Sequence, residues 1–266
     1  MSEPDISELA RALIPTAHQA GRCIMSHFGK ADVEYKDDKS PVTVADREAD
    51  AIIVERLIEL APDIPIVSEE SSPAQPIGSS DSFFLVDPLD GTKEFINGRD
   101  EFTVNIALIE KGIPRFGLVY APASSKLYVT LEPEQAVMTH INPAQALPAF
   151  DALKLEPIKT RTPDACGLIA AVSRSHLTCE TQDFLKKHRI AQTFMSGSSL
   201  KFCCLAEGLA DVYPRFGRTM EWDTAAGHAV LGAAGGAVVD ETGAPLRYGK
   251  TEHSFANPSF IAWGRI

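Results

Sequence analysis

The sequence predicts an α+β protein in which layers of helices stack on layers of sheet. Apolar residues recur at roughly helical spacing over residues 6–28. Three successive apolar runs, at 103–109, 116–120 and 127–130, are typical of the strands of a meander. After residue 165, strand and helix patterns are mixed along the chain. Such a mixture of strands and helices favours layered sheets and helices over an all-α or all-β fold.

Two helices are expected in the N-terminal quarter of the chain. The first covers residues 6–28, and Pro15 is expected to kink it because proline donates no backbone hydrogen bond. Thr43 and Asp46 form the T-x-x-D pattern of a capping box. A second helix is therefore expected to follow them and to run through Leu60.

The remaining elements follow from apolar runs between turn residues. The serine-, proline- and glycine-rich segment 71–82 predicts a loop, and so does the polar segment 36–41. The last predicted helix consists of small residues and must pack closely. Strands are expected at 64–68, 83–86 (ending at Asp87-Pro88), 167–172, 210–213 and 237–240, and helices at 179–188, 198–207 and 224–234.

The length of 266 residues allows one large domain or two small lobes that share a core. Residues 132–165 are rich in proline and alanine and have weak periodicity, so they are expected to connect two lobes. These would be an N-terminal α+β lobe (about 1–135) and a C-terminal α/β lobe (about 150–266), together making a single unit.

The formal charge of −11 argues against a nucleic-acid polymer as partner, because proteins that bind one are usually basic. The same acidity would repel a phosphorylated substrate, which must then be attracted locally by metal ions or clustered cations. The five cysteines are odd in number and form no CxxC pair, so their spacing predicts neither a disulfide framework nor a zinc site. We infer a reducing compartment.

The N-terminal segment MSEPDISELARALI is acidic at its start and lacks the basic and apolar regions of a signal peptide. No apolar run approaches the ~18 residues of a membrane span. The expected localisation is therefore cytoplasmic.

The strongest functional signal is the segment Leu85-Val-Asp-Pro-Leu-Asp-Gly-Thr92. An apolar strand delivers Asp87 at its carboxyl end, and Asp90 follows just before a predicted helix start at Gly91-Thr92. Carboxylates bind hard divalent cations, and unpaired amides at a helix start bind phosphate oxygens. Both are needed for metal-assisted phosphoryl transfer. An Asp-Pro turn followed by an Asp cap is the alternative explanation.

Three further acidic elements lie at the ends of predicted strands or helices. Glu69 and Glu70 follow a short strand, Asp46 completes the capping box, and Asp223 resembles the N-cap of the small-residue helix. Each has an ordinary explanation: a solvated pair of glutamates, or a capping acid. Taken together, four such acidic elements favour a metal site.

The paired segments Leu85-Val-Asp-Pro-Leu-Asp-Gly-Thr92 and Trp222-Asp-Thr-Ala-Ala-Gly-His228 resemble the signatures of the inositol monophosphatase superfamily. Narrower matches resemble the bacterial 3'(2'),5'-bisphosphate nucleotidases of this superfamily. The similarity extends from about residue 6 to residue 260, and the motifs occur in the same order. They are Ser40-Pro-Val-Thr43, Ser68-Glu-Glu70, Asp90-Gly-Thr-Lys-Glu-Phe95, Phe102-Thr-Val-Asn-Ile-Ala-Leu108, Gly197-Ser-Ser-Leu-Lys-Phe202 and Tyr213-Pro-Arg-Phe-Gly217. The resemblance implies a layered α-β-α-β-α sandwich.

The resemblance also implies a metal centre with two or three Mg²⁺ ions, which lower the pKa of a water and stabilise the leaving oxygen. Asp46 and Thr92 would hold and orient the attacking water, and Glu69 would serve both catalysis and metal binding, with Glu70 outside the ligand set. The implied ligands are Glu69, Asp87, Asp90, Asp223 and the carbonyl of Leu89.

The implied substrate is a bisphosphorylated adenosine nucleotide, 3'-phosphoadenosine 5'-phosphate or its 5'-phosphosulfate, with a role in sulfur assimilation and nucleotide recycling. Ser198 and Lys201 lie three residues apart near a helix start and can meet one anion. A solvated lysine is the alternative for Lys201. The implied substrate contacts are Gly91, Thr92, His176, Ser198, Lys201, Arg215 and Asp223.

Other functions remain open at this point. An inositol monophosphatase is the first alternative, although Lys93 stands where those enzymes usually carry a neutral residue. Fructose-1,6-bisphosphatase is another, with a longer chain and different motifs. A catalytically silent, cation-binding regulatory protein is a third. The resemblance implies lithium sensitivity. It leaves open the choice between monomer and homodimer, and attachment to the cytoplasmic face of the inner membrane.

Overall fold

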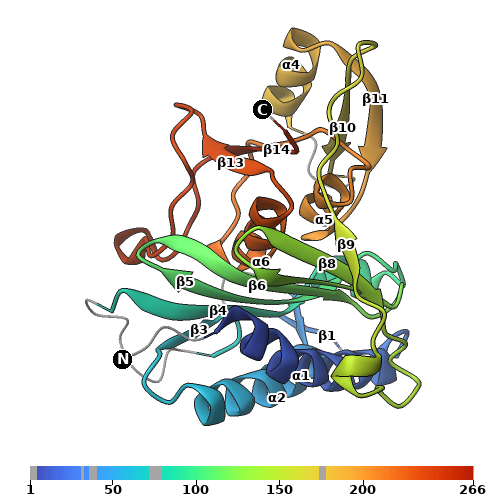
Figure 1. The fold of residues 1–266 in the computed structure, drawn as a ribbon, viewed down its shortest axis with the longest axis vertical. Coiled ribbons are helices and arrows are strands. Elements are labelled where there is room, and N and C mark those ends of the chain that lie inside the picture. The colour runs from blue at the N-terminus through green and yellow to red at the C-terminus, as the bar shows by residue number, and fades with distance from the viewer. Residues whose placement is uncertain (1–4, 31–32, 36–40, 72–79, 174–177, 266) are drawn as a thin grey trace.

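The computed structural model describes residues 5–265 apart from 31–32, 36–40, 72–79 and 174–177. The chain forms five layers in the order helix, sheet, helix, sheet, helix, which confirms the predicted sandwich (Figure 1). The first helical layer is α1 (Ile6–His27) and α2 (Val44–Leu60). The middle layer is α5 (Leu200–Ala206) and α6 (Glu221–Ala233), and the last is α4 (Cys179–Lys187).

The larger sheet has seven strands in chain order, and every neighbouring pair except β3 and β4 is antiparallel. The predicted meander is therefore correct. Two of its strands, β8 and β9, lie in the segment 132–165, for which no strand was predicted. The strands are β3 (Ile66–Ser68), β4 (Ser82–Asp90), β5 (Thr103–Glu110), β6 (Ile113–Ala121), β7 (Lys126–Glu132), β8 (Gln135–His140) and β9 (Glu156–Ile158).

Both faces of this sheet are covered, as the side chains of β5 demonstrate. Ile106 and Leu108 belong to the apolar cluster under α1 and α2, whereas Ala107 and Ile109 belong to the cluster on the α6 side. Because alternate residues face different layers, every residue of β5 is buried. The strand therefore appears in the sequence as a nearly continuous apolar run.

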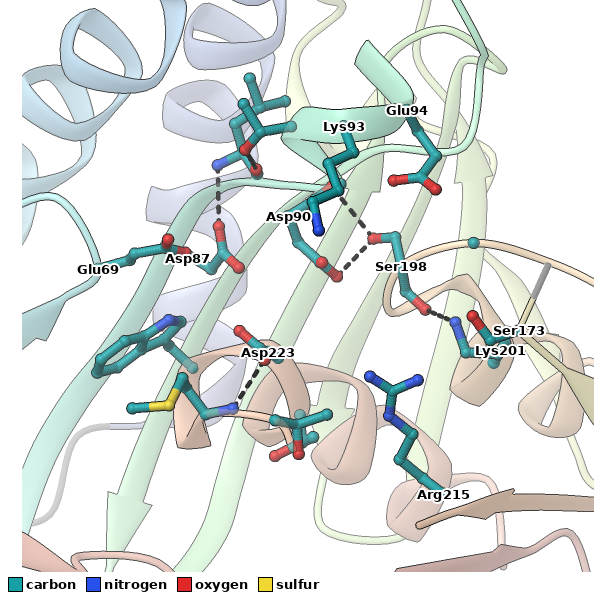
Figure 2. A pocket seen from close by; sticks show the side chains of 18 of the residues that line it. Glu69, Asp87, Asp90, Lys93, Glu94, Ser173, Ser198, Lys201, Arg215 and Asp223 are labelled. Carbon is teal, nitrogen blue, oxygen red and sulfur yellow. Dashed lines mark hydrogen bonds between the residues drawn. The ribbon is translucent and has the colours of Figure 1, made fainter. Parts of the chain in front are cut away.

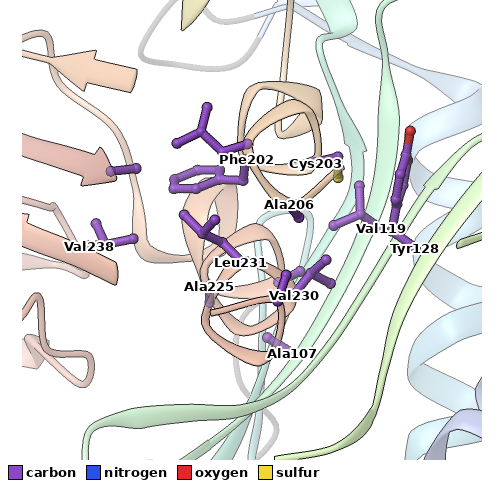
Figure 3. Packing of buried hydrophobic residues seen from close by; sticks show 14 of the residues in the cluster. Ala107, Val119, Tyr128, Phe202, Cys203, Ala206, Ala225, Val230, Leu231 and Val238 are labelled. Atoms are coloured by element: carbon purple, nitrogen blue, oxygen red, sulfur yellow. The ribbon is translucent and has the colours of Figure 1, made fainter. Parts of the chain in front are cut away.

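Helix α6 packs directly on this sheet, and its small residues permit the close approach (Figure 3). A Cβ added at Gly117 of β6 would lie 2.2 Å from the carbonyl oxygen of Ala226 in α6. A Cβ at Gly227 would lie 2.6 Å from the ring of Phe202 in α5. The predicted close packing of the small-residue helix is therefore correct.

The smaller sheet has the order β11-β10-β12-β14-β13, in which β14 runs antiparallel to its two neighbours. Strands β11 and β14, and the small ribbon β1-β2, were not predicted. The bounds are β10 (Leu168–Val172), β11 (Ile190–Met195), β12 (Val212–Arg215), β13 (Ala237–Asp240), β14 (Phe260–Trp263), β1 (Val33–Tyr35) and β2 (Pro41–Thr43), with 3-10 turns at Phe150–Ala152 and Thr251–His253.

Two predicted boundaries are wrong in ways that matter for the site. Strand β4 does not end at Asp87-Pro88 but reaches Asp90, with an irregular register between Asp87 and Asp90. Pro88, which has no N–H to pair, lies at this irregularity. Helix α6 starts at Glu221, so Asp223 is its third residue and not its N-cap.

Several expectations lie outside what the structure describes. Residues 36–40 and 72–79, most of the two predicted loops, are not described. Pro15 lies inside α1, and the kink expected there stays a prediction, as do the lobe boundaries. Among the helices that the structure describes, none combines the length and the apolar character needed to cross a membrane.

Candidate active site

Three carboxylates from distant parts of the chain meet at one point. Glu69 follows β3, Asp87 lies in β4, and Asp223 lies in the first turn of α6. Each offers an oxygen within 4.8 Å of the ligand atoms of the other two. Figure 2 shows them on one side of a cavity of about 720 Å³, which lies between the larger sheet and the C-terminal layers. Three of the four predicted metal-ligand carboxylates are thus brought together.

The negative charge at this point is poorly solvated. Burial, and then the neighbouring Glu69, raise the pKa of Asp87 well above its usual range. Burial and the nearby Asp90 do the same for the pKa of Asp223. Crowded carboxylates of this kind are stabilised by a cation, and an all-oxygen ligand set suits Mg²⁺ or Ca²⁺ better than softer metals. The residues present therefore fit a magnesium site.

Asp90 lines the same cavity but lies outside the three-residue cluster. Its Oδ2 accepts hydrogen bonds from the hydroxyl of Ser198, the backbone amide of Ser199 at 2.7 Å and the side-chain amide of Asn105 at 3.3 Å. Ser199 in turn donates its hydroxyl to the carbonyl oxygen of Asp223 at 2.7 Å. These contacts fix the Asp90 carboxylate and connect it to the start of α6.

The capping box of α2 forms a second part of the site. Asp46 is 1% exposed, and its Oδ2 accepts from the amide of Thr43 at 2.8 Å and from the hydroxyl of Thr43 at 2.6 Å. The hydroxyl of Thr92 lies 3.1 Å from both Asp46 Oδ1 and the carbonyl oxygen of Leu89. Asp46 is therefore a helix cap and a partner of a cavity residue at the same time. Burial raises its pKa.

Gly91 makes the turn from β4 into α3 (Thr92–Ile96) with φ +94°. A Cβ at this position would lie 2.9 Å from the carbonyl oxygen of Glu101, so the left-handed conformation and the lack of space both require glycine. Gly91 and Thr92 line the cavity beside Asp87 and Asp90. The turn thus places the first residues of α3 next to the acidic cluster.

Cationic side chains line the other side of the cavity. The guanidinium of Arg215, at the end of β12, points into the cavity in Figure 2. Its Nη2 donates to the carbonyl oxygen of Arg218 at 3.3 Å, and its buried Nε has no hydrogen-bond partner among the described residues. An anion that enters the cavity would supply the missing acceptor.

Lys201 is buried beside the cavity. It is only 4% exposed, so it is not a solvated helix lysine. Its ammonium group donates to the carbonyl oxygen of Ser198 at 2.7 Å and lies 3.4 Å from that of Ser196. Lys201 and Ser198 both line the cavity and contact each other there, and the expectation that they face one anion stays a prediction. Burial, opposed by the charge of Asp90, lowers the pKa of Lys201 to about 8.

Two site residues were missed in the sequence. Asn105 and Ser199 hold Asp90, yet neither was singled out. A single asparagine inside the apolar run of β5 was a usable signal, because a buried amide needs hydrogen-bond partners. Of the predicted substrate contacts, His176 lies outside the described residues.

The chain resembles known proteins along nearly its whole length. The model of the inositol monophosphatase family matches residues 5–263. A 3'(2'),5'-bisphosphate nucleotidase CysQ from Shigella flexneri is 45% identical, and the match covers 92% of this chain and 95% of that protein. The crystal structure of CysQ from Bacteroides thetaiotaomicron superposes with a TM-score of 0.82 at 39% identity, covering 98% of both chains. The structure of an IMPase from Thermotoga maritima superposes with a TM-score of 0.73 at 26% identity. The match covers 94% of this chain and 90% of that chain.

Proposed function

The chain belongs to the inositol monophosphatase family, and from its similarity to the CysQ bisphosphate nucleotidases we propose that it is a magnesium-dependent 3'(2'),5'-bisphosphate nucleotidase. The proposed reaction is hydrolysis of 3'-phosphoadenosine 5'-phosphate to AMP and phosphate. The observation that carries the proposal is that one cavity has a cluster of three carboxylates on one side and two cationic side chains on the other. Glu69, Asp87 and Asp223 meet on one side, and Arg215 and Lys201 line the other.

The acidic half is proposed to bind the phosphate that is cleaved. Mg²⁺ bound there would lower the pKa of a water and stabilise the departing ester oxygen. The proposed ligands are the carboxylates of Glu69, Asp87, Asp90 and Asp223 with the carbonyl of Leu89. The proposed number of Mg²⁺ ions is two or three. Inhibition by lithium remains a prediction of the family resemblance.

Thr92 and Asp46 are proposed to orient the attacking water and to accept its proton. The Thr92 hydroxyl lies 3.1 Å from Asp46 Oδ1, so its proton can point at the carboxylate while an oxygen lone pair faces the cavity. Thr43 donates to the other oxygen of Asp46 and keeps the carboxylate fixed. In this arrangement, a water proton passes to Thr92 as the Thr92 proton passes to Asp46.

The cationic half is proposed to bind the second phosphate. A guanidinium forms paired hydrogen bonds with phosphate oxygens, and the unpartnered Nε of Arg215 suits this role. Lys201 adds positive charge and holds the 196–198 segment through two carbonyl oxygens. Ser198, Gly91, Thr92 and Asp223 complete the proposed substrate contacts. A monophosphate substrate would leave the cationic half unused.

The test is phosphate release from adenosine 3',5'-bisphosphate, inositol 1-phosphate and fructose 1,6-bisphosphate at saturating Mg²⁺. The proposal expects the highest kcat/KM on the adenosine bisphosphate. Faster release from inositol 1-phosphate would assign the chain to the inositol monophosphatases instead. Absence of release from all three, with Mg²⁺ bound, would favour a cation-binding regulatory protein.

A further inference from the structure

A second cluster of metal-binding side chains lies on the helical layer, formed by groups from α1 and α2. Cys23 and His27 are four residues apart on α1, which places them on one face of the helix. Glu48 of α2 faces them. One ligand atom of each residue lies within 4.8 Å of those of the other two.

The contacts inside this cluster are short and centre on one oxygen. Oε2 of Glu48 lies 3.1 Å from the Sγ of Cys23 and 2.9 Å from the Nε2 of His27. A tetrahedral Zn²⁺ with one sulfur, one nitrogen and one oxygen ligand separates these atoms by roughly 3.3–3.6 Å. Moving the Glu48 oxygen about half an ångström away from the other two atoms would bring both of its distances to these values, and all three atoms already lie within 4.8 Å of one another. The side chain of Glu48 is 52% exposed, so it can make that shift.

The donor set differs in kind from that of the acidic cluster. A thiolate and an imidazole favour zinc and similar transition metals, whereas Mg²⁺ prefers oxygen ligands alone. Three protein ligands leave a fourth tetrahedral position for water or another ligand. The cysteine count did not reveal this arrangement, because the pattern is Cys-x3-His on one helix completed by a glutamate 21 residues beyond His27.

The cluster is also separate from the cavity. Glu48 follows Asp46 by two residues, which places them about 200° apart around α2. Asp46 is 1% exposed and contacts Thr92 of the cavity, whereas Glu48 is exposed on the outer side. None of the three side chains is among the residues that line the cavity.

We propose that Cys23, His27 and Glu48 form a transition-metal site, selective for Zn²⁺ over Mg²⁺, that fastens the C-terminal end of α1 to α2. The Sγ–metal bond replaces the S–H bond of Cys23, and the proton passes to the solvent. An ion that binds only the folded chain stabilises it by mass action. The site is independent of the proposed nucleotidase activity.

The test is a Co²⁺ titration of the full chain with the acidic cluster saturated by Mg²⁺. A thiolate ligand gives Co²⁺ a near-ultraviolet charge-transfer band that carboxylates do not give, so the band reports Cys23 and not the cavity. The expected result is a band that saturates at one Co²⁺ per chain and is abolished by Zn²⁺. Cys23→Ser should abolish the band, whereas Cys166→Ser, at an exposed cysteine outside the cluster, should keep it.

His27→Gln changes a partly exposed side chain and Glu48→Gln an exposed one, so both variants should keep the fold. Each should weaken Zn²⁺ binding at least tenfold, since even partners that only orient a ligand contribute about 10- to 100-fold. Absence of a band in the unaltered chain would overturn the proposal. A band that survives Cys23→Ser, or Zn²⁺ binding unchanged in both glutamine variants, would overturn it as well.

Discussion

Asn105 donates its side-chain amide to the carboxylate of Asp90 at 3.3 Å, although its direct partner across the β4–β5 pair is Asp87. The irregular register between Asp87 and Asp90 makes this diagonal contact possible. The same amide lies 3.0 Å from the hydroxyl of Ser199, so it links the larger sheet to the segment before α5. The contact indicates that Asn105 positions the Asp90 carboxylate, which is proposed to bind metal.

Replacing Asn105 with alanine should therefore lower activity on every substrate. A hydrogen bond to a charged group contributes about 1.5–3 kcal/mol. This corresponds to a roughly ten- to hundredfold fall in kcat/KM. The Mg²⁺ concentration for half-maximal activity should rise in parallel, which a purely structural role would not cause. Asn142→Ala, at an exposed asparagine remote from the cavity, is the matched control. An unchanged Mg²⁺ requirement in Asn105→Ala would exclude the positioning role.

Asp87→Asn should abolish activity and yet stabilise the metal-free protein. The folded-state pKa of Asp87 is raised above its usual value of 3.8, so ionising this carboxyl in the folded chain costs free energy that the unfolded chain does not pay. That cost is present above the raised pKa and disappears as the pH falls toward 3.8. Asparagine removes it without a change of volume. Thermal unfolding in chelator should give a higher Tm for the variant, and Mg²⁺ should raise its Tm less. A lower Tm in chelator would contradict this explanation.

The buried ammonium of Lys201 predicts a pH effect that is specific to the bisphosphate. Its pKa is lowered to about 8, so the charge is present below that pH and is lost as the pH rises through it. The ratio of kcat/KM for the adenosine bisphosphate to that for a small phosphate ester should fall over this range. The reaction of both substrates uses the same attacking water, so pH effects on that water cancel in the ratio. Lys201→Met should give a lower ratio that no longer changes near pH 8. If the ratio of this variant still changes near pH 8, another group causes the pH effect.

The contact between β6 and α6 predicts opposite effects for two glycine substitutions. Gly117→Ala places a methyl group 2.2 Å from the carbonyl oxygen of Ala226 and should destabilise the fold by about 1–3 kcal/mol. Gly232→Ala, in α6 with no neighbouring atom within 4 Å, should stabilise it by about 0.5–1 kcal/mol. Urea unfolding of both variants measures the difference. Equal effects would show that the two layers are not closely packed at Gly117.

The sequence predicted the layers and most of the acidic cluster because local rules determine them. The box formed by Thr43 and Asp46, the meander of β5 to β7 and the small residues of α6 all follow from spacing and residue type. Asp87 and Asp223 were predicted because Asp87 ends an apolar run beside a proline and Asp223 resembles a helix N-cap. The structure places Asp87 inside β4 and Asp223 in the first turn of α6.

What the sequence did not predict depends on contacts between distant residues. The role of Ser199 requires its amide to meet Asp90, 109 positions away. Lys201 looks like a surface residue in its short helix and is buried only because β12 and the 196–198 segment enclose it. Strands β11 and β14 depend on pairing with β10, β12 and β13, which no local pattern encodes.

The proposal that one phosphate is cut at the acidic cluster while the other lies against Arg215 can be tested with a single variant. Arg215→Ala should lower kcat/KM for adenosine 3',5'-bisphosphate roughly ten- to hundredfold, since it removes a charge-assisted contact of about 1.5–3 kcal/mol. A small phosphate monoester, which does not reach Arg215, should be hydrolysed at nearly the original rate under the same Mg²⁺ concentration. An equal loss on both substrates, or no loss on either, would contradict a two-ended site.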